Sequence, residues 1–181
     1  MTLEKAVAIE PHLHAIVLGK TKSGKTFLMM SKAREYRRLG KGVIALHKPR
    51  EPWPESCVNW QTSDPAAFLK KFWRCQNVVA FIEVSDASVG KYNEQFWKCA
   101  TEGRHNGIRC YFIGQRAAQI HPEIRDNCDG VYLFVCGHAA AKALAEEKDD
   151  PGLLQAAAMP RFWFWYKPND FTPAKLSILK S

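Results

Sequence analysis

The sequence lacks the features of several common protein classes. Its six cysteines include no C-x-x-C pair, which argues against a zinc site and favours reduced thiols. No apolar run approaches the roughly 20 residues that cross a bilayer, and the first residues do not resemble a secretory signal. Internal repeats, low-complexity tracts and linkers are also missing. We therefore expect an intracellular, soluble chain without a transmembrane segment, folded as a single domain over residues 1–181.

Acidic residues are scarce in one part of the chain. Between Lys20 and Arg50 there are ten basic residues and a single acid, Glu35, whereas the remainder carries 16 basic and 17 acidic residues. This block accounts for the formal net charge of +8. A basic surface of this kind suits a polyanion such as nucleic acid, and the alternative is a solvated helix face without a partner.

Apolar runs without strict alternation recur between helical segments. Strands are expected at residues 12–18, 42–46, 77–84, 107–114, 130–136 and, rich in aromatics, 161–168. Helices are expected at residues 25–39, 65–75, 91–102 and 138–147, the second of them capped by Asp64. Strands of this kind, separated by helices, form a parallel sheet that is covered on both faces. The aromatic strand is interpreted as a core or edge strand rather than a base-stacking platform.

A phosphate-binding motif follows the first strand directly. GKTKSGKT, residues 19–26, satisfies G-x-x-x-x-G-K-[ST] at every fixed position. The glycines let backbone N–H groups turn around phosphate oxygens, Lys25 reaches the β and γ phosphates, and the Thr26 hydroxyl joins a Mg²⁺ shell at a helix N-terminus. The residues expected to bind the nucleotide are Gly19, Lys20, Thr21, Lys22, Ser23, Gly24, Lys25 and Thr26. The motif predicts a nucleoside triphosphate with magnesium as ligand.

The ends of two other strands supply candidate partners for the phosphates. Glu83 ends the third strand, where a carboxylate binds Mg²⁺ or orients the attacking water. Gln115 follows the fourth strand, where its amide could sense the γ phosphate. The N-K-x-D motif of guanine recognition does not occur. A phosphate loop alone does not separate kinases, GTPases, motors and helicases.

The order of these motifs resembles the FtsK/HerA superfamily of DNA-pumping ATPases. The phosphate loop, the acid of the third strand, GRH at residues 103–105, a strand that ends in Gln, and HPEIRDNCDGVYLF follow one another over residues 14–167. Within the superfamily the chain is most similar to the packaging ATPases of tailless, membrane-containing icosahedral DNA viruses and phages. The resemblance implies a RecA-like, doubly wound α/β fold of three layers (αβα), with a mostly parallel sheet.

The resemblance also implies function and residue roles. It implies ATP hydrolysis with Mg²⁺ that drives double-stranded DNA into a preformed capsid, by a homo-oligomeric ring that meets a capsid vertex or portal protein, in the host cytoplasm or at the virion vertex. Lys25, Glu83, Gln115 and Arg104 would be catalytic, with Thr26 and Glu83 on the metal side. Glu83 would occupy the Walker B position, Gln115 would be the strand-four sensor, and Arg104 is the candidate arginine finger.

One departure from the family leaves roles open. The family usually ends this strand in Asp-Glu, whereas here Glu83 is followed by Val84, with Asp86 further on. Either Glu83 serves the metal and Asp86 activates water, or Glu83 is the catalytic base and the other acid is lost. Two rival functions follow: a P-loop nucleotide or small-molecule kinase, and a nucleotide-dependent virion or pilus assembly protein that hydrolyses little.

Overall fold

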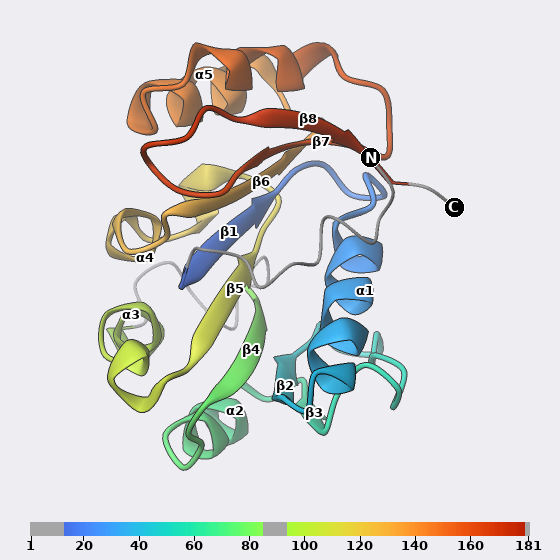
Figure 1. Cartoon of the computed structure of the whole chain (residues 1–181), viewed down its shortest axis with the longest axis vertical. Helices are drawn as coiled ribbons and strands as arrows, with labels where there is room; N and C mark the ends of the chain where they lie inside the picture. The colour runs from blue at the N-terminus through green and yellow to red at the C-terminus, as the bar shows by residue number, and fades with distance from the viewer. Residues whose placement is uncertain (1–12, 85–93, 180–181) are drawn as a thin grey trace.

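Eight strands form one sheet in the order β3-β2-β4-β5-β1-β6-β7-β8, in a computed structural model that describes residues 13–84 and 94–179 (Figure 1). The strands are β1 (His14–Leu18), β2 (Gly42–Leu46), β3 (Trp60–Thr62), β4 (Val78–Glu83), β5 (Arg109–Ile113), β6 (Gly130–Phe134), β7 (Trp163–Lys167) and β8 (Lys175–Ile178). Strands β1 to β6 pair in parallel, and β7 and β8 add an antiparallel hairpin beside β6.

Helices cover both faces of this sheet. They are α1 (Lys25–Arg38), α2 (Pro65–Phe72), α3 (Glu94–Thr101), α4 (Pro122–Asp126) and α5 (His138–Glu147), with 3₁₀ helices η2 (Gly103–Asn106), η3 (Ala117–Gln119) and η4 (Pro151–Ala158). One core cluster packs α2 to α5 and η4 on one face, and the other packs α1 and the loop at 53–58 on the opposite face (Figure 1). The predicted three-layer α/β fold is therefore confirmed.

The predicted elements agree with the structure except at short segments. The predictions for 42–46 and 138–147 match β2 and α5, and Asp64 accepts a hydrogen bond from the Ala66 N–H as the cap of α2. The expected helix at 91–102 is described from Glu94 to Thr101, and the aromatic strand is shortened to β7. We did not predict β3 or β8, because β3 has three half-buried residues in a Pro-containing region and β8 is an exposed edge strand.

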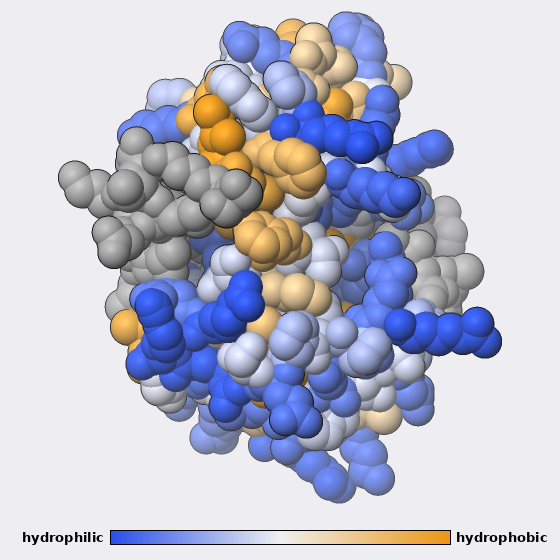
Figure 2. Space-filling model, turned by 90° about the vertical axis from the view of Figure 1, so that its right-hand side faces the viewer, coloured by the Kyte–Doolittle hydropathy of each residue, from blue (hydrophilic) through white to orange (hydrophobic). Residues whose placement is uncertain are grey.

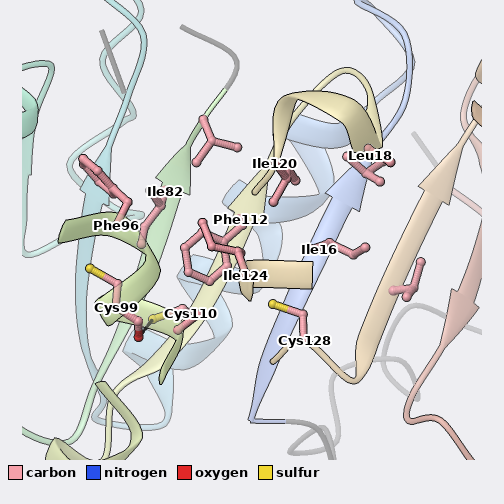
Figure 3. Close-up of a cluster of buried hydrophobic side chains, with 14 of the residues drawn as sticks. Ile16, Leu18, Ile82, Phe96, Cys99, Cys110, Phe112, Ile120, Ile124 and Cys128 are labelled. Carbon is pink, nitrogen blue, oxygen red and sulfur yellow. Dashed lines mark hydrogen bonds between the residues drawn. The ribbon is translucent and has the colours of Figure 1, made fainter. Parts of the chain in front are cut away.

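The core on the α3–α4 face contains four buried cysteines, three of which are labelled in Figure 3. Cys99, Cys110 and Cys128 are fully buried, and the Cys110 thiol donates to the Cys99 carbonyl at 3.6 Å. Burial raises the pKa of all three thiols above the usual cysteine value. No cluster of three or more His, Cys, Asp or Glu side chains suited to a metal occurs in the described ranges. These thiols are core residues in reduced form.

Candidate active site

The phosphate loop leaves the carboxyl end of β1 with strained backbone that glycine accommodates. Gly19 and Gly24 have φ values of 145° and 108°, in the region that L side chains rarely adopt. A Cβ atom on Gly19 would lie 2.6 Å from Cβ of Phe134, so a side chain could not fit there. The Lys20 N–H donates to the Val135 carbonyl at 2.9 Å and fixes the loop to the end of β6. Both glycines are thus required by this loop geometry.

Lys25 is buried at the start of α1 and folds back over the loop. Its Nζ donates to the carbonyl groups of Gly19 and Lys20, at 2.6 and 2.9 Å. Burial lowers the pKa of Lys25 to about 8, and the nearby Glu83 carboxylate partly opposes this shift. The buried Ser23 hydroxyl has no hydrogen-bond partner in the part of the chain that is described. Because burial disfavours the charged form of Lys25, a bound anion such as a phosphate would stabilise its ammonium group.

Glu83 and Gln115 come to the same sheet edge as the phosphate loop. Glu83 ends β4 and is 8% exposed, and it pairs in register with Ile113, two residues before Gln115. The Gly114 N–H donates to the Val17 carbonyl at 2.9 Å, which ties the start of the Gln115 turn to β1. The structure therefore brings Lys25, Glu83 and Gln115 to one edge of the sheet. Asp86 lies outside the described residues.

Two residues that sequence reasoning missed hold the turn at Gln115. The Gln119 side-chain oxygen accepts from the backbone N–H groups of Gln115 and Arg116, at 3.1 and 3.0 Å. Arg125 donates to the carbonyls of Ala117 and Ile120 and forms an ion pair with Glu147 at 2.9 Å. Arg125 belongs to the HPEIRDNCDG segment, which carries part of the family resemblance. No local signal could have found these roles, because the Glu147 contact bridges distant segments.

A cavity of about 410 Å³ opens between the phosphate loop and α5. It is lined by Lys20, Thr21, Gln115, Arg116, Cys136, Gly137, Ala139 and Ala140. The lining includes two cationic side chains and no carboxylate, and α5 begins there with no side-chain cap on its free N–H groups. The electrostatics of this cavity favour an anion.

Arg104 lies at the opposite edge of the sheet from the phosphate loop. It belongs to η2, which precedes β5, and the Asn77 N–H just before β4 donates to the Asn106 carbonyl of η2 at 2.9 Å. The five residues of β5 separate this edge from Gln115, roughly 17 Å at the usual rise of a strand. The Arg104 side chain is exposed. Arg104 is therefore not brought together with the other predicted catalytic residues of its own chain.

The basic block from Lys20 to Arg50 is divided among several roles. Lys25 and Lys32 are buried, and Lys32 lies 4.8 Å from the centre of the Tyr132 ring. Arg37 donates to the Glu55 carbonyl, and Arg38 pairs with Glu35. The exposed members of the block are Lys20, Lys22, Arg34, Arg38, Lys41 and Arg50. The block thus forms a smaller free basic surface than its composition suggests.

The residues expected at magnesium have the right chemistry for it. Thr26 is exposed at the first turn of α1, and Glu83 ends the neighbouring β4 at the same edge. Hydroxyl and carboxylate oxygens are hard ligands of the kind that Mg²⁺ prefers. The donor set therefore fits this metal.

Fold and phosphate loop together define the class: the chain has the α/β fold of P-loop NTPases. Among solved structures it is similar to the genome packaging NTPase B204 of Sulfolobus turreted icosahedral virus 2 in complex with AMP, with a TM-score of 0.75, 13% identity, and 93% of this chain and 98% of that chain covered. No family model and no curated protein sequence matches the chain.

Two further solved structures have the same fold. The pCW3 conjugation coupling protein TcpA with ATPγS gives a TM-score of 0.63 at 16% identity, over 90% of this chain and 58% of that one. The N-terminal domain of zonular occludens toxin from Neisseria meningitidis gives 0.57 at 13% identity, over 92% and 93%. The resemblance inferred from the motifs is thus confirmed at the level of the fold. None of the described helices is both long and apolar enough to span a membrane.

Proposed function

We propose that the chain is an ATPase that translocates double-stranded DNA into a preformed viral capsid. The observation that carries the proposal is the meeting of Lys25, Glu83 and Gln115 at one edge of a fold similar to that of a genome packaging NTPase. In this proposal subunits form a homo-oligomeric ring, at a capsid vertex or portal protein, in the host cytoplasm or on the virion.

The proposed chemistry is the transfer of the γ-phosphoryl group of ATP to water. A bond forms between the water oxygen and the γ phosphorus, the bond to the β–γ bridging oxygen breaks, and ADP leaves. Lys25 and the loop N–H groups hold the phosphates, and bound Mg²⁺ would neutralise developing charge beside Thr26 and Glu83. Glu83 serves either the metal or the proton of the attacking water. Gln115 reports the γ phosphate to the turn held by Gln119.

The first experiment measures ATP turnover with and without long duplex DNA. We expect DNA to stimulate turnover, and we expect Lys25→Ala to lower it about 10²–10³-fold, as does the loss of one electrostatic contact to a transition state. Lys70→Ala is the matched control, because Lys70 is exposed on α2 and lies outside the basic block. Unchanged turnover in Lys25→Ala would refute the nucleotide site. Phosphate transfer to a small acceptor, without an effect of DNA, would favour a kinase.

One observation favours a second function, a nucleotide-dependent assembly protein that hydrolyses little. β4 ends in a single acid, Glu83, between Ile82 and Val84, whereas the family that the sequence resembles usually has Asp-Glu at the end of this strand. The same assay separates the two functions. Tight ATP binding with negligible turnover, whether or not DNA is present, would support assembly.

A further inference from the structure

We propose that Phe162 stacks on the base of the bound nucleotide and favours purine nucleoside triphosphates. The proposal rests on the proposed nucleotide site, and it assigns a role to the hairpin that extends the sheet beyond β6. Phe162 immediately precedes β7.

Phe162 is attached to the last residues of the phosphate loop. Its backbone N–H donates to the Ser23 carbonyl at 3.2 Å, and its carbonyl accepts from the Leu179 N–H at 2.8 Å. Its ring carbon Cδ1 lies 3.2 Å from the position that a Cβ atom of Gly24 would take. The aromatic ring is thus beside the point where the loop becomes α1.

The backbone of Phe162 is held in an unfavourable conformation. Its φ angle is 69°, in the left-handed region that bulky residues rarely adopt. The residue is nevertheless 52% exposed, and its ring takes part in none of the aromatic contacts found among the described residues. Strained backbone that presents an exposed aromatic is typical of binding sites. The strain is not explained by packing of the ring in the core.

Phe162 lies beside the loop that would hold the phosphates, next to Gly24 and Ser23. A second aromatic side chain, Phe27 in the first turn of α1, is also 49% exposed. Figure 2 shows apolar side chains gathered among hydrophilic ones on the face that carries α1. The base is covalently tied to the phosphates, so a ring beside Gly24 is within its reach.

Stacking determines the chemical class of the ligand. An aromatic face binds any base, with a preference for the larger purine surface, and one such contact strengthens binding roughly 5- to 150-fold. Inorganic tripolyphosphate shares the phosphate contacts and has no base. The contribution of Phe162 should therefore appear with ATP or GTP and vanish with tripolyphosphate.

The test compares dissociation constants for ATP, CTP and tripolyphosphate by calorimetry. We expect Phe162→Ala to weaken ATP binding about 10-fold, to weaken CTP binding less, and to leave tripolyphosphate unchanged. Phe162→Asn should give the same result with a relaxed backbone, because Asn tolerates positive φ. Phe162→Trp should retain ATP binding. Phe171→Ala is the control, since Phe171 is 97% exposed and lies between β7 and β8, at the opposite edge of the sheet from the phosphate loop.

Three results would overturn the proposal. An equal loss for ATP and tripolyphosphate would show that Phe162 only supports the loop backbone. No loss for ATP, with a changed oligomeric state in Phe162→Ala, would show that the ring contacts a second copy of the chain. If the unaltered protein bound neither ATP nor tripolyphosphate, the nucleotide site itself would be wrong, and this proposal would fall with it.

Discussion

Buried charges occur at both edges of the sheet, and the two edges differ in how fully the fold satisfies them. At the amino edge of the parallel strands, where β7 ends, Lys167 donates to the carbonyls of Thr172 and Asp170 and lies 3.6 Å from the Asp150 carboxylate. Asp150 in turn accepts from the N–H groups of Gly152 and Ala174. At the carboxyl edge, the hydrogen bonds that Lys25 donates within the described ranges go to carbonyls of its own loop, and burial lowers its pKa.

The buried charges of Lys167 and Asp150 stabilise the fold, whereas the buried charge of Lys25 is suited to a ligand. A buried ion with a complete set of partners fastens the segments that supply them, here η4 and the loop between β7 and β8. A buried cation whose charged form is disfavoured gains free energy when an anion arrives. The exposed Arg104 at the amino edge belongs to neither group, because it has a charge but no buried setting.

The largest expected effect concerns Arg104 and would extend the comparison to two subunits. Since Arg104 lies at the opposite edge from its own phosphate loop, it can reach a nucleotide only in a neighbouring subunit. Arginine fingers contribute about 10³–10⁵ in rate. We expect Arg104→Ala to keep ATP binding and to lose DNA-stimulated turnover by a factor in this range. Mixing it with Lys25→Ala subunits should restore part of the activity, measured as phosphate release.

The control for Arg104 is another exposed arginine near the same edge. Arg74 follows α2, just before β4, and is exposed, so Arg74→Ala should leave turnover unchanged. Verified mixed rings without recovered activity, together with a small loss of thermal stability in Arg104→Ala, would assign Arg104 a capping role at a helix end instead.

Sequence alone predicts the phosphate loop and the main parallel strands because their signals are local. The glycines of residues 19–24 and the apolar runs of β1, β2, β4, β5 and β6 are contiguous in the chain. The supporting contacts are not contiguous: Arg125 meets Glu147, and Phe162 meets Ser23 across most of the chain. The placement of Arg104 away from the loop follows only from strand direction in the folded sheet.

The second prediction concerns the buried ion pair between Asp150 and Lys167 at the amino edge of the sheet. Asp150→Ala removes the carboxylate beside buried Lys167 and leaves that ammonium without its counter-charge. Breaking a buried ion pair on one side costs about 3–5 kcal/mol of unfolding free energy. We expect this loss in urea denaturation, with ATP affinity unchanged under conditions where the variant is folded.

The control for Asp150 is a surface pair on the neighbouring helix. Glu146 lies 3.9 Å from Lys142 and its side chain is 70% exposed, so Glu146→Ala should change stability by less than about 1 kcal/mol. A large loss of ATP affinity in Asp150→Ala, without a loss of stability, would contradict the assignment of a structural role to the amino edge and a ligand-binding role to the carboxyl edge.

The smallest predicted effect is a proton taken up at the carboxyl edge. With a pKa of about 8, Lys25 is roughly three quarters neutral at pH 8.5 and mostly charged at pH 7, and a bound phosphate favours its charged form. Nucleotide binding should therefore take up about 0.7 proton at pH 8.5 and about 0.1 at pH 7. Calorimetry in buffers with different ionisation enthalpies measures this number, and Lys25→Met should abolish it.

The same lysine should affect stability and affinity with opposite signs as pH rises. Its folded pKa of about 8 lies below the ordinary value of 10.5, so between these values the unfolded chain binds more protons and the contribution of Lys25 to folding becomes more favourable. Over the same interval ATP affinity should fall, because the cation that binds the phosphates is lost. Glu83 and Lys48 are the charged groups that act on Lys25. Affinity that stays constant from pH 7 to pH 9.5, with no proton uptake, would show that Lys25 is already fully charged before ligand arrives.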